Sequence, residues 1–189
     1  MMKRIFVVLA LVLSTGLLAS PLTASACVED AVAQDVHVGD LVKTSDSSTV
    51  SYIAANGLRF NFPNAAVYKS WYGNDFSKVK VISKTQLSYR PLGGYVMFRP
   101  NTKLVQFIGS RDVYVVVKNN ELRRLPSAAI ANQVLGLGWT RNVEKLPARF
   151  GGAVKFGFDI TTPGDYEPSK QTVPVEITWS TPLNMVVMR

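Results

Sequence analysis

The chain of 189 residues offers few side chains that could carry out catalysis. Its one histidine, His37, lies in an acidic N-terminal stretch with no serine or cysteine motif around it, so we expect no Ser-His-Asp or Cys-His site. With Cys27 as the one cysteine, we also expect no zinc bound by Cys and His. Glycoside hydrolysis needs only two carboxylates, and Asp75 and Asp112 are the best-placed acids. Neither lies in a context that would give two carboxyl groups different pKa values. We therefore expect no enzyme and no catalytic residues, with a carbohydrate-active enzyme as the alternative.

A metal site would have to consist almost wholly of carboxylates. Asp159, Asp165 and Glu167 could be imagined around calcium, but their spacing fits no EF-hand loop. We expect a solvated acidic turn there, no bound metal and no cofactor.

Aromatic and basic side chains are the better candidates for ligand contact. Trp71, Tyr72 and Trp139 could stack on sugar rings, and Arg123 and Arg124 could hold an anionic group through forked hydrogen bonds. Aromatic residues of short helices usually pack against a neighbouring sheet, so the core is the expected place for Trp71 and Trp139. Neighbours in a strand face opposite ways, so at most one of the two arginines is expected to join a single patch.

These candidates lie within a sequence repeat with a constant offset of 63 residues. The stretch GLRFNFPNAAVYKSWYG (57–73) matches NELRRLPSAAIANQVLG (120–136), and the match extends without a gap over residues 41–76 of the first copy. Chance rarely places a Pro, an Ala-Ala and a Gly at one fixed offset inside matching apolar patterns. An internal duplication is the best explanation.

Each copy predicts two strands and a short helix. Residues 49–55 and 58–62 are strand-like and are joined by Asn56-Gly57, a pair that suits a type I′ turn, and Asn119-Asn120 stands at that place in the second copy. A proline ends each hairpin. Asn64 and Ser127 then suit helix N-caps, and Gly73 and Gly136 suit left-handed C-caps.

Further elements follow from local signals. An extended return is expected at 78–82, a second short helix from Ser83 with the capping-box partner Gln86, and strands at 95–100 and 103–108. Residues 153–160 alternate as a strand, 161–170 are typical of a loop, and 173–179 are typical of an edge strand.

These elements predict a β-rich α+β fold, in which two hairpin-helix repeats share one core because a single hairpin is only marginally stable in water. The expected divisions are an acidic segment at 27–40, repeat 1 at 41–103, repeat 2 at 104–158 and a C-terminal β extension at 159–189.

The first 26 residues have the pattern of a secretory signal peptide, with Lys3-Arg4, an apolar run and the small-residue site Ala24-Ser25-Ala26. The apolar run is shorter than the roughly 20 residues of a spanning helix. Cys27 would then begin the mature chain. Its position resembles the cysteine of a bacterial lipoprotein box, although Ala24 stands where Leu is usual. Plain secretion and lipidation of Cys27 therefore both stay open. A lipid on Cys27 is the only membrane attachment that we expect.

The charge is uneven along the mature chain. Residues 41–158 hold 17 Lys and Arg against 5 Asp and Glu, a net of +12, whereas residues 27–40 hold four acids and no Lys or Arg. The basic residues are dispersed, which favours a solvated surface over a charged tract. An anionic envelope polysaccharide or a surface protein is the expected partner, and nucleic acid is not, because an exported chain meets little of it.

The stretches GDLVK (39–43), YIAANGLRFNFPN (52–64), YKSWYGNDFSKVKVIS (68–83) and PLGGYVMFRPNTKLV (91–105) resemble a tandem repeat unit of secreted, mostly uncharacterised surface proteins of small-genome (candidate-phyla type) bacteria. The resemblance runs from about Gly39 to about Pro168 and implies an extracellular or cell-surface location without implying any reaction. The expected function is an exported, non-enzymatic binding or structural module of the cell envelope, of unassigned oligomeric state.

Overall fold

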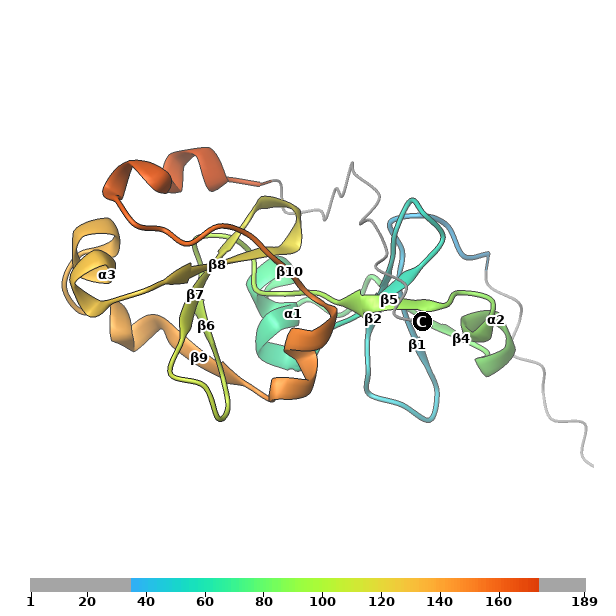
Figure 1. Ribbon diagram of the computed structural model, residues 1–189. Helices are drawn as coiled ribbons and strands as arrows, with labels where there is room; N and C mark the ends of the chain where they lie inside the picture. Colours follow the sequence, from blue (N-terminus) through green and yellow to red (C-terminus); the bar gives the residue numbers. More distant parts are fainter. Residues whose placement is uncertain (1–34, 174–189) are drawn as a thin grey trace, which may run out of the picture.

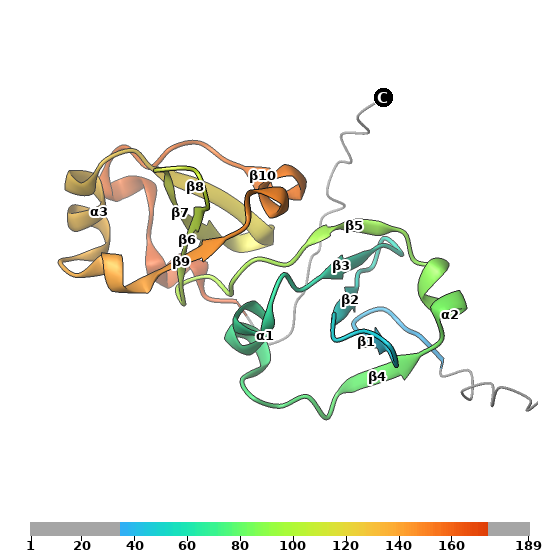
Figure 2. The same ribbon diagram turned by 90° about the horizontal axis from the view of Figure 1, so that it is seen from below.

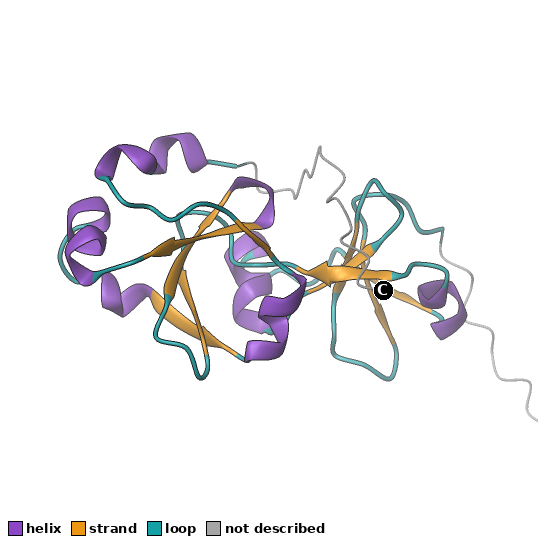
Figure 3. Ribbon diagram, in the orientation of Figure 1, coloured by secondary structure: helices purple, strands orange, loops and turns teal. Residues whose placement is uncertain are grey.

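Two five-stranded sheets lie toward opposite ends of the described molecule, residues 35–173 of this computed structural model (Figures 1 and 2). The first has the spatial order β4 (Val79–Ile82), β1 (Leu41–Thr44), β2 (Ser51–Ile53), β3 (Arg59–Asn61), β5 (Leu92–Tyr95). The second has the order β9 (Val143–Leu146), β6 (Leu104–Phe107), β7 (Val113–Val117), β8 (Glu121–Leu125), β10 (Lys155–Phe156). Both follow one topology, which is the β-rich α+β fold of two similar units that the repeat predicts (Figure 3).

The strand register repeats as well as the order. Leu41 pairs with Tyr52 in the first sheet, and Leu104 pairs with Val115, at the equivalent positions, in the second. The equivalence continues beyond the strands. The Val96 amide donates to Asn61 O at 3.0 Å, and the Ile160 amide donates to Arg124 O at 2.9 Å. The second unit therefore matches the first through Ile160, two residues beyond the expected boundary at 158.

The two hairpin turns differ from each other. In the first, the Gly57 amide donates to Ala54 O at 2.9 Å, and Gly57 has a positive φ of 79° whereas Asn56 does not. The type I′ prediction is wrong here, because the Ala54 amide donates to Leu58 O at 2.9 Å, which leaves a loop of residues 55–57 that ends in a glycine bulge in place of a two-residue loop. In the second turn Asn119 and Asn120 both have a φ of 60°. The loop has the same length as in the first unit, because Val117 pairs with Glu121 and leaves residues 118–120 between them.

The predicted helix boundaries are confirmed. Helices α1 (Ala65–Tyr72) and α3 (Ala128–Leu135) begin after Asn64 and Ser127. Each of these side chains accepts a hydrogen bond from the backbone amide three residues further along the chain. Gly73 and Gly136 follow the last helical residues with φ of 64° and 81°. Their ψ angles of −142° and 175° are extended, so these glycines end the helices in a region open to glycine and not in the left-handed α conformation.

The second helix of the first unit, α2 (Lys84–Ser88), is confirmed too. The Ser83 side chain accepts from the Gln86 amide and the Gln86 side chain accepts from the Ser83 amide, which is the predicted capping box. In the second unit a 3₁₀ helix, η3 (Ala148–Ala153), follows β9 in the corresponding place.

One core runs through both units. Helix α1 lies between the two sheets (Figures 1 and 2), and its buried side chains belong to a cluster with residues of both repeats. That cluster includes Tyr52, Phe60, Val67, Tyr68, Trp71, Met97, Phe98, Val105, Val116, Leu122, Leu146 and Phe150. Rings also meet across the units, since Tyr95 and Phe150 lie edge to face at 4.6 Å. The expectation of a shared core is confirmed.

The segments that join and follow the repeats are less regular than expected. The strand predicted at 95–100 is wrong, because β5 ends at Tyr95 and residues 96–100 form no strand. The strand predicted at 153–160 is confined to β10. After β10, the described residues contain 3₁₀ helices η4 (Pro163–Asp165) and η5 (Pro168–Gln171) and no strand. Both begin with proline, which cannot donate to a sheet and whose fixed φ suits a first helical position. The loop predicted at 161–170 thus contains two short 3₁₀ helices, and the described part of the predicted β extension has no strand.

The strand predicted at 173–179 lies outside the described residues, apart from Val173, and so do the predicted signal peptide and Cys27. No helix within residues 35–173 has the length and apolarity needed to cross a bilayer.

Candidate functional site

Two of the predicted ligand-contact residues serve packing. Trp71 is buried, and its indole Nε1 donates to Met97 O at 2.9 Å, which ties α1 to the segment between the units. Tyr72 is half-buried, with its ring centroid 6.2 Å from that of Phe62 and 5.2 Å from that of Tyr68. The first unit thus uses its helix aromatics inside the protein, as expected for Trp71.

Arg123 and Arg124 hold a neighbouring stretch of the chain. Arg123 donates to Phe158 O at 2.8 Å and to Asp165 O at 2.6 Å. Arg124 Nε lies 3.2 Å from both carboxylate oxygens of Asp159, and hydrogen bonds from Arg124 hold the pKa of the Asp159 carboxyl below its usual value.

Both arginines reach one segment, against the expectation that they would serve different patches. The reason lies in the backbone, because residues 157–160 continue from β10 along the same edge of β8, where Gly157 donates to Leu122 O at 2.9 Å. Long side chains from either face of a strand can fold around its edge. In this structure the two guanidinium groups are occupied by protein groups and do not form a free anion site.

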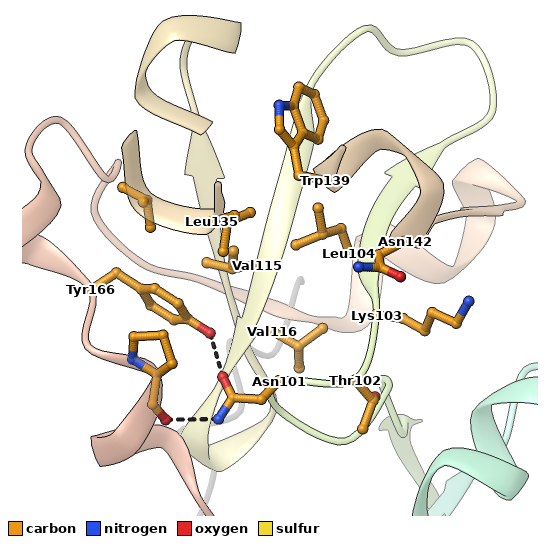
Figure 4. A pocket seen from close by; sticks show the side chains of 12 residues that line it. Asn101, Thr102, Lys103, Leu104, Val115, Val116, Leu135, Trp139, Asn142 and Tyr166 are labelled. Atoms are coloured by element: carbon orange, nitrogen blue, oxygen red, sulfur yellow. Dashed lines mark hydrogen bonds between the residues drawn. The ribbon is translucent and has the colours of Figure 1, made fainter. Parts of the chain in front are cut away.

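Trp139 borders a cavity of about 240 Å³ (Figure 4). It begins the 3₁₀ helix η2 (Trp139–Asn142), is half-buried, and donates through Nε1 to Asn132 Oδ1 at 3.0 Å. The cavity lies between α3, strands β6 and β7, and the segments on either side of the second unit. Its lining consists of Asn101, Thr102, Lys103, Leu104, Val115, Val116, Val134, Leu135, Trp139, Asn142, Tyr166 and Pro168.

Comparison of the two repeats explains why the cavity exists. At the fixed offset, Val134 stands in the place of Trp71, Leu135 in the place of Tyr72, and Val115 in the place of Tyr52. All three changes replace an aromatic ring by a smaller aliphatic side chain. In the first unit Tyr52 and Trp71 are buried in the core, so the same framework in the second unit leaves space unfilled. Aligning the copies and comparing side-chain volumes would have found this site in the sequence.

The polar groups around the cavity are mostly committed to one another. Asn101 accepts from the Tyr166 hydroxyl at 2.6 Å and donates to Pro168 O at 2.7 Å (Figure 4). Burial raises the pKa of the Tyr166 phenol, which keeps it neutral. Lys103 pairs with Glu144 at 3.1 Å. The Asn142 amide makes no hydrogen bond with the described part of the chain.

This lining suits a small neutral ring. Trp139 supplies an aromatic wall, the aliphatic residues supply an apolar floor, and Asn142 supplies an amide that can both donate and accept. A volume of about 240 Å³ is below the roughly 300 Å³ at which pockets enclose drug-sized ligands, so the cavity accommodates one ring or one end of a larger molecule.

The acids considered for chemistry do not converge on this cavity. Asp75 accepts from the Ser77 amide at 2.9 Å, and hydrogen bonds from Ser77 lower its pKa. Asp112 faces Arg124 at 3.5 Å. Each is thus a local structural acid, and neither lines the cavity.

The acids imagined around calcium make separate contacts. Asp159 pairs with Arg124, Asp165 accepts from backbone amides, and Glu167 pairs with Lys170 at 2.8 Å. Within the described residues no three His, Cys, Asp or Glu side chains are grouped so that they could hold a metal ion.

Comparison of the chain with protein-family models, curated proteins and solved structures found no match.

Proposed function

We propose that this protein is an exported, non-catalytic binding module of the bacterial cell envelope, and that it holds one sugar ring of an envelope glycan in the cavity beside Trp139. The single observation that carries the proposal is that cavity, with its aromatic wall, apolar floor and uncommitted amide. The predicted signal peptide supports the location. The stable shared core supports a role as a rigid carrier of the site.

The chemistry of the lining favours an N-acetylated amino sugar. The pyranose ring stacks on the Trp139 indole, because sugar C–H groups suit an aromatic face. The acetyl methyl group packs on Leu104 and Val115, and the acetamido group exchanges hydrogen bonds with Asn142. Each contact is neutral, so affinity depends little on salt.

This differs from attraction between a basic face and an anionic polymer, which is the other route to the same partner. The arginines that a polymer would need, Arg123 and Arg124, are held by carbonyl oxygens and by Asp159. Lys103, the cation at the cavity, is paired with Glu144. A neutral ligand disturbs none of these contacts.

The test is calorimetric titration with oligosaccharides of N-acetylglucosamine and, for comparison, of glucose, at low and high salt. We expect binding of the acetylated series only, with little change across the salt series. Trp139→Ala should weaken it about tenfold, the loss of one good aromatic contact. Val134→Trp, which restores the residue of the first unit, should fill the cavity and abolish binding. Leu137→Ala is the control, because Leu137 is 91% exposed and does not line the cavity.

Other outcomes would overturn the proposal. Steeply salt-dependent binding that ignores Trp139→Ala and Val134→Trp would place the partner on a charged face. Absence of binding to any envelope glycan would favour a structural role. Turnover of a glycan that is lost when one acid is replaced would establish the carbohydrate-active enzyme instead.

A further inference from the structure

A buried side chain of the second unit binds the segment through which the chain leaves the first unit. Asn120, in the hairpin turn of the second unit, accepts from the Met97 amide at 2.7 Å and donates to Tyr95 O at 2.7 Å. Its side chain thereby makes the two hydrogen bonds to backbone groups that a neighbouring strand would otherwise make. Asn120 is 7% exposed and Met97 is fully buried, so this is an interior contact.

The segment that leaves the second unit begins in the same way and then meets a different partner. Ile160 repeats the strand-like bond of Val96, which makes Asp159 O and the Thr161 amide the equivalents of Tyr95 O and the Met97 amide. The Thr161 amide donates to Asp165 Oδ2 at 2.8 Å, and Asp159 O accepts from Arg123 at 3.4 Å. The side chains of Asp165, in the segment that follows the second unit, and of Arg123, within that unit, thus do what Asn120 does for the first.

The chain after Ile160 also covers apolar surface. Ile160 is fully buried and Tyr166 is 5% exposed, and both belong to a cluster with Leu104, Leu125 and Ala131 of the second unit. Asn101 fixes this cover through the Tyr166 hydroxyl and Pro168 O. The segment 161–171 is therefore a folded part of the structure that lies where a following unit would begin.

At the other end, the first unit lacks the docking group. Gly57 occupies the position of Asn120 and has no side chain with which to bind a preceding segment. The first unit is thus suited to begin a stack of repeats, and the second to receive another unit.

We propose that the outer face of the second unit is a docking surface for a further repeat whose hairpin turn carries an asparagine at the position of Asn120, and that residues 161–171 are the intramolecular cap of this surface. Repeat proteins generally need such a terminal cover, because the face that stacks on the next repeat is otherwise exposed. The cap also supplies Tyr166 and Pro168 to the cavity.

Two chains with a third repeat test the proposal. In the first, residues 161–189 are replaced by a second copy of residues 97–189, so that Ile160 continues directly into Met97 of the added copy. In the second, the same copy follows Arg189, so that the original cap remains. The chains carry the same three units, and the second also keeps residues 161–189, so that the surface stays covered.

We expect the added copy to dock only where the cap is absent. That chain should show the smaller radius of gyration in X-ray scattering and a single unfolding transition. Asn120→Gly in the added copy should lower the midpoint of that unfolding transition. The capped chain should be more extended, and the same substitution should leave its first two units unaffected. Val134→Trp in the receiving unit should strengthen docking, because it restores the donor that Trp71 provides to Met97 O. Equal compactness of the two chains, or independent unfolding of the added copy in both, would overturn the proposal.

A measurement on the natural chain is independent of the added copy. Asp165→Ala should speed hydrogen exchange at the Thr161 and Thr162 amides and protease cleavage within 161–171, while exchange at Met97 stays slow. If Asp165→Ala unfolds the whole second unit, residues 161–171 are part of its core and not a cap.

Discussion

Replacing Asn120 should uncouple the two units. In Asn120→Gly the backbone keeps its positive φ of 60°, but the Met97 amide and Tyr95 O lose their partners. A buried backbone group left unpaired costs about 1–3 kcal/mol, so two of them should lower the free energy of unfolding by roughly 2–6 kcal/mol. Asn120→Ala should cost about 1 kcal/mol more, because alanine is strained at positive φ.

The neighbouring asparagine is the matched control. Asn119 has the same φ of 60°, but its side chain is exposed and makes no hydrogen bond to another described residue. Asn119→Gly should change the free energy of unfolding by less than about 0.5 kcal/mol. The pair of glycine substitutions therefore separates the backbone effect from the two hydrogen bonds.

The assay is urea unfolding followed by tryptophan fluorescence, since Trp71 binds the same residue through Met97 O. We expect a lower midpoint for Asn120→Gly and non-additive effects when it is combined with Trp71→Phe, because both side chains hold Met97. Equal effects of Asn119→Gly and Asn120→Gly would refute the reasoning. They would mean that water can form the hydrogen bonds to the Met97 amide and Tyr95 O in place of Asn120.

Two further predictions concern single positions. Gly73→Ala and Gly136→Ala should each lower the free energy of unfolding by about 1–2 kcal/mol, and by similar amounts, because both glycines have positive φ and no heavy atom lies within 4 Å of an added Cβ. Thermal unfolding of the two variants measures this, and a large difference between them would contradict it. Backbone hydrogen bonds from Thr162 and Thr161 lower the pKa of Asp165 from 3.8, so its contribution should be complete above that pH and fade as the pH falls further. Comparison of the unfolding midpoints of the natural chain and Asp165→Asn across the acid range checks this, and a difference that grows on acidification would have the wrong sign.

Much of the local structure is predictable from short stretches of sequence. Asn64, Ser127 and Ser83 act at helix N-termini through atoms three residues away, so the pattern of residue types is enough to find them. The repeat likewise predicts two similar units, because similar sequences have similar local preferences. The type of the turn at Asn56-Gly57 is not predictable in this way, because Asn-Gly is compatible with more than one loop length and strand pairing selects among them.

The site depends on contacts that no short stretch contains. Arg123 and Arg124 meet Asp159 only because residues 157–160 run beside β8, and this pairing is set by the path of the chain. The cavity beside Trp139 needs both the smaller residues of the second helix and the cover formed by Tyr166 and Pro168.

By itself the sequence determined the duplication, the β-rich α+β class, the helix ends and the scarcity of catalytic side chains. Tertiary structure alone decided that Trp71 is core while Trp139 borders a cavity, that Asn120 joins the units, and that residues 161–171 cover the second. The physical reason is range: capping and strand propensity act over a few residues, whereas burial and hydrogen bonding of these groups depend on partners brought together by the whole fold.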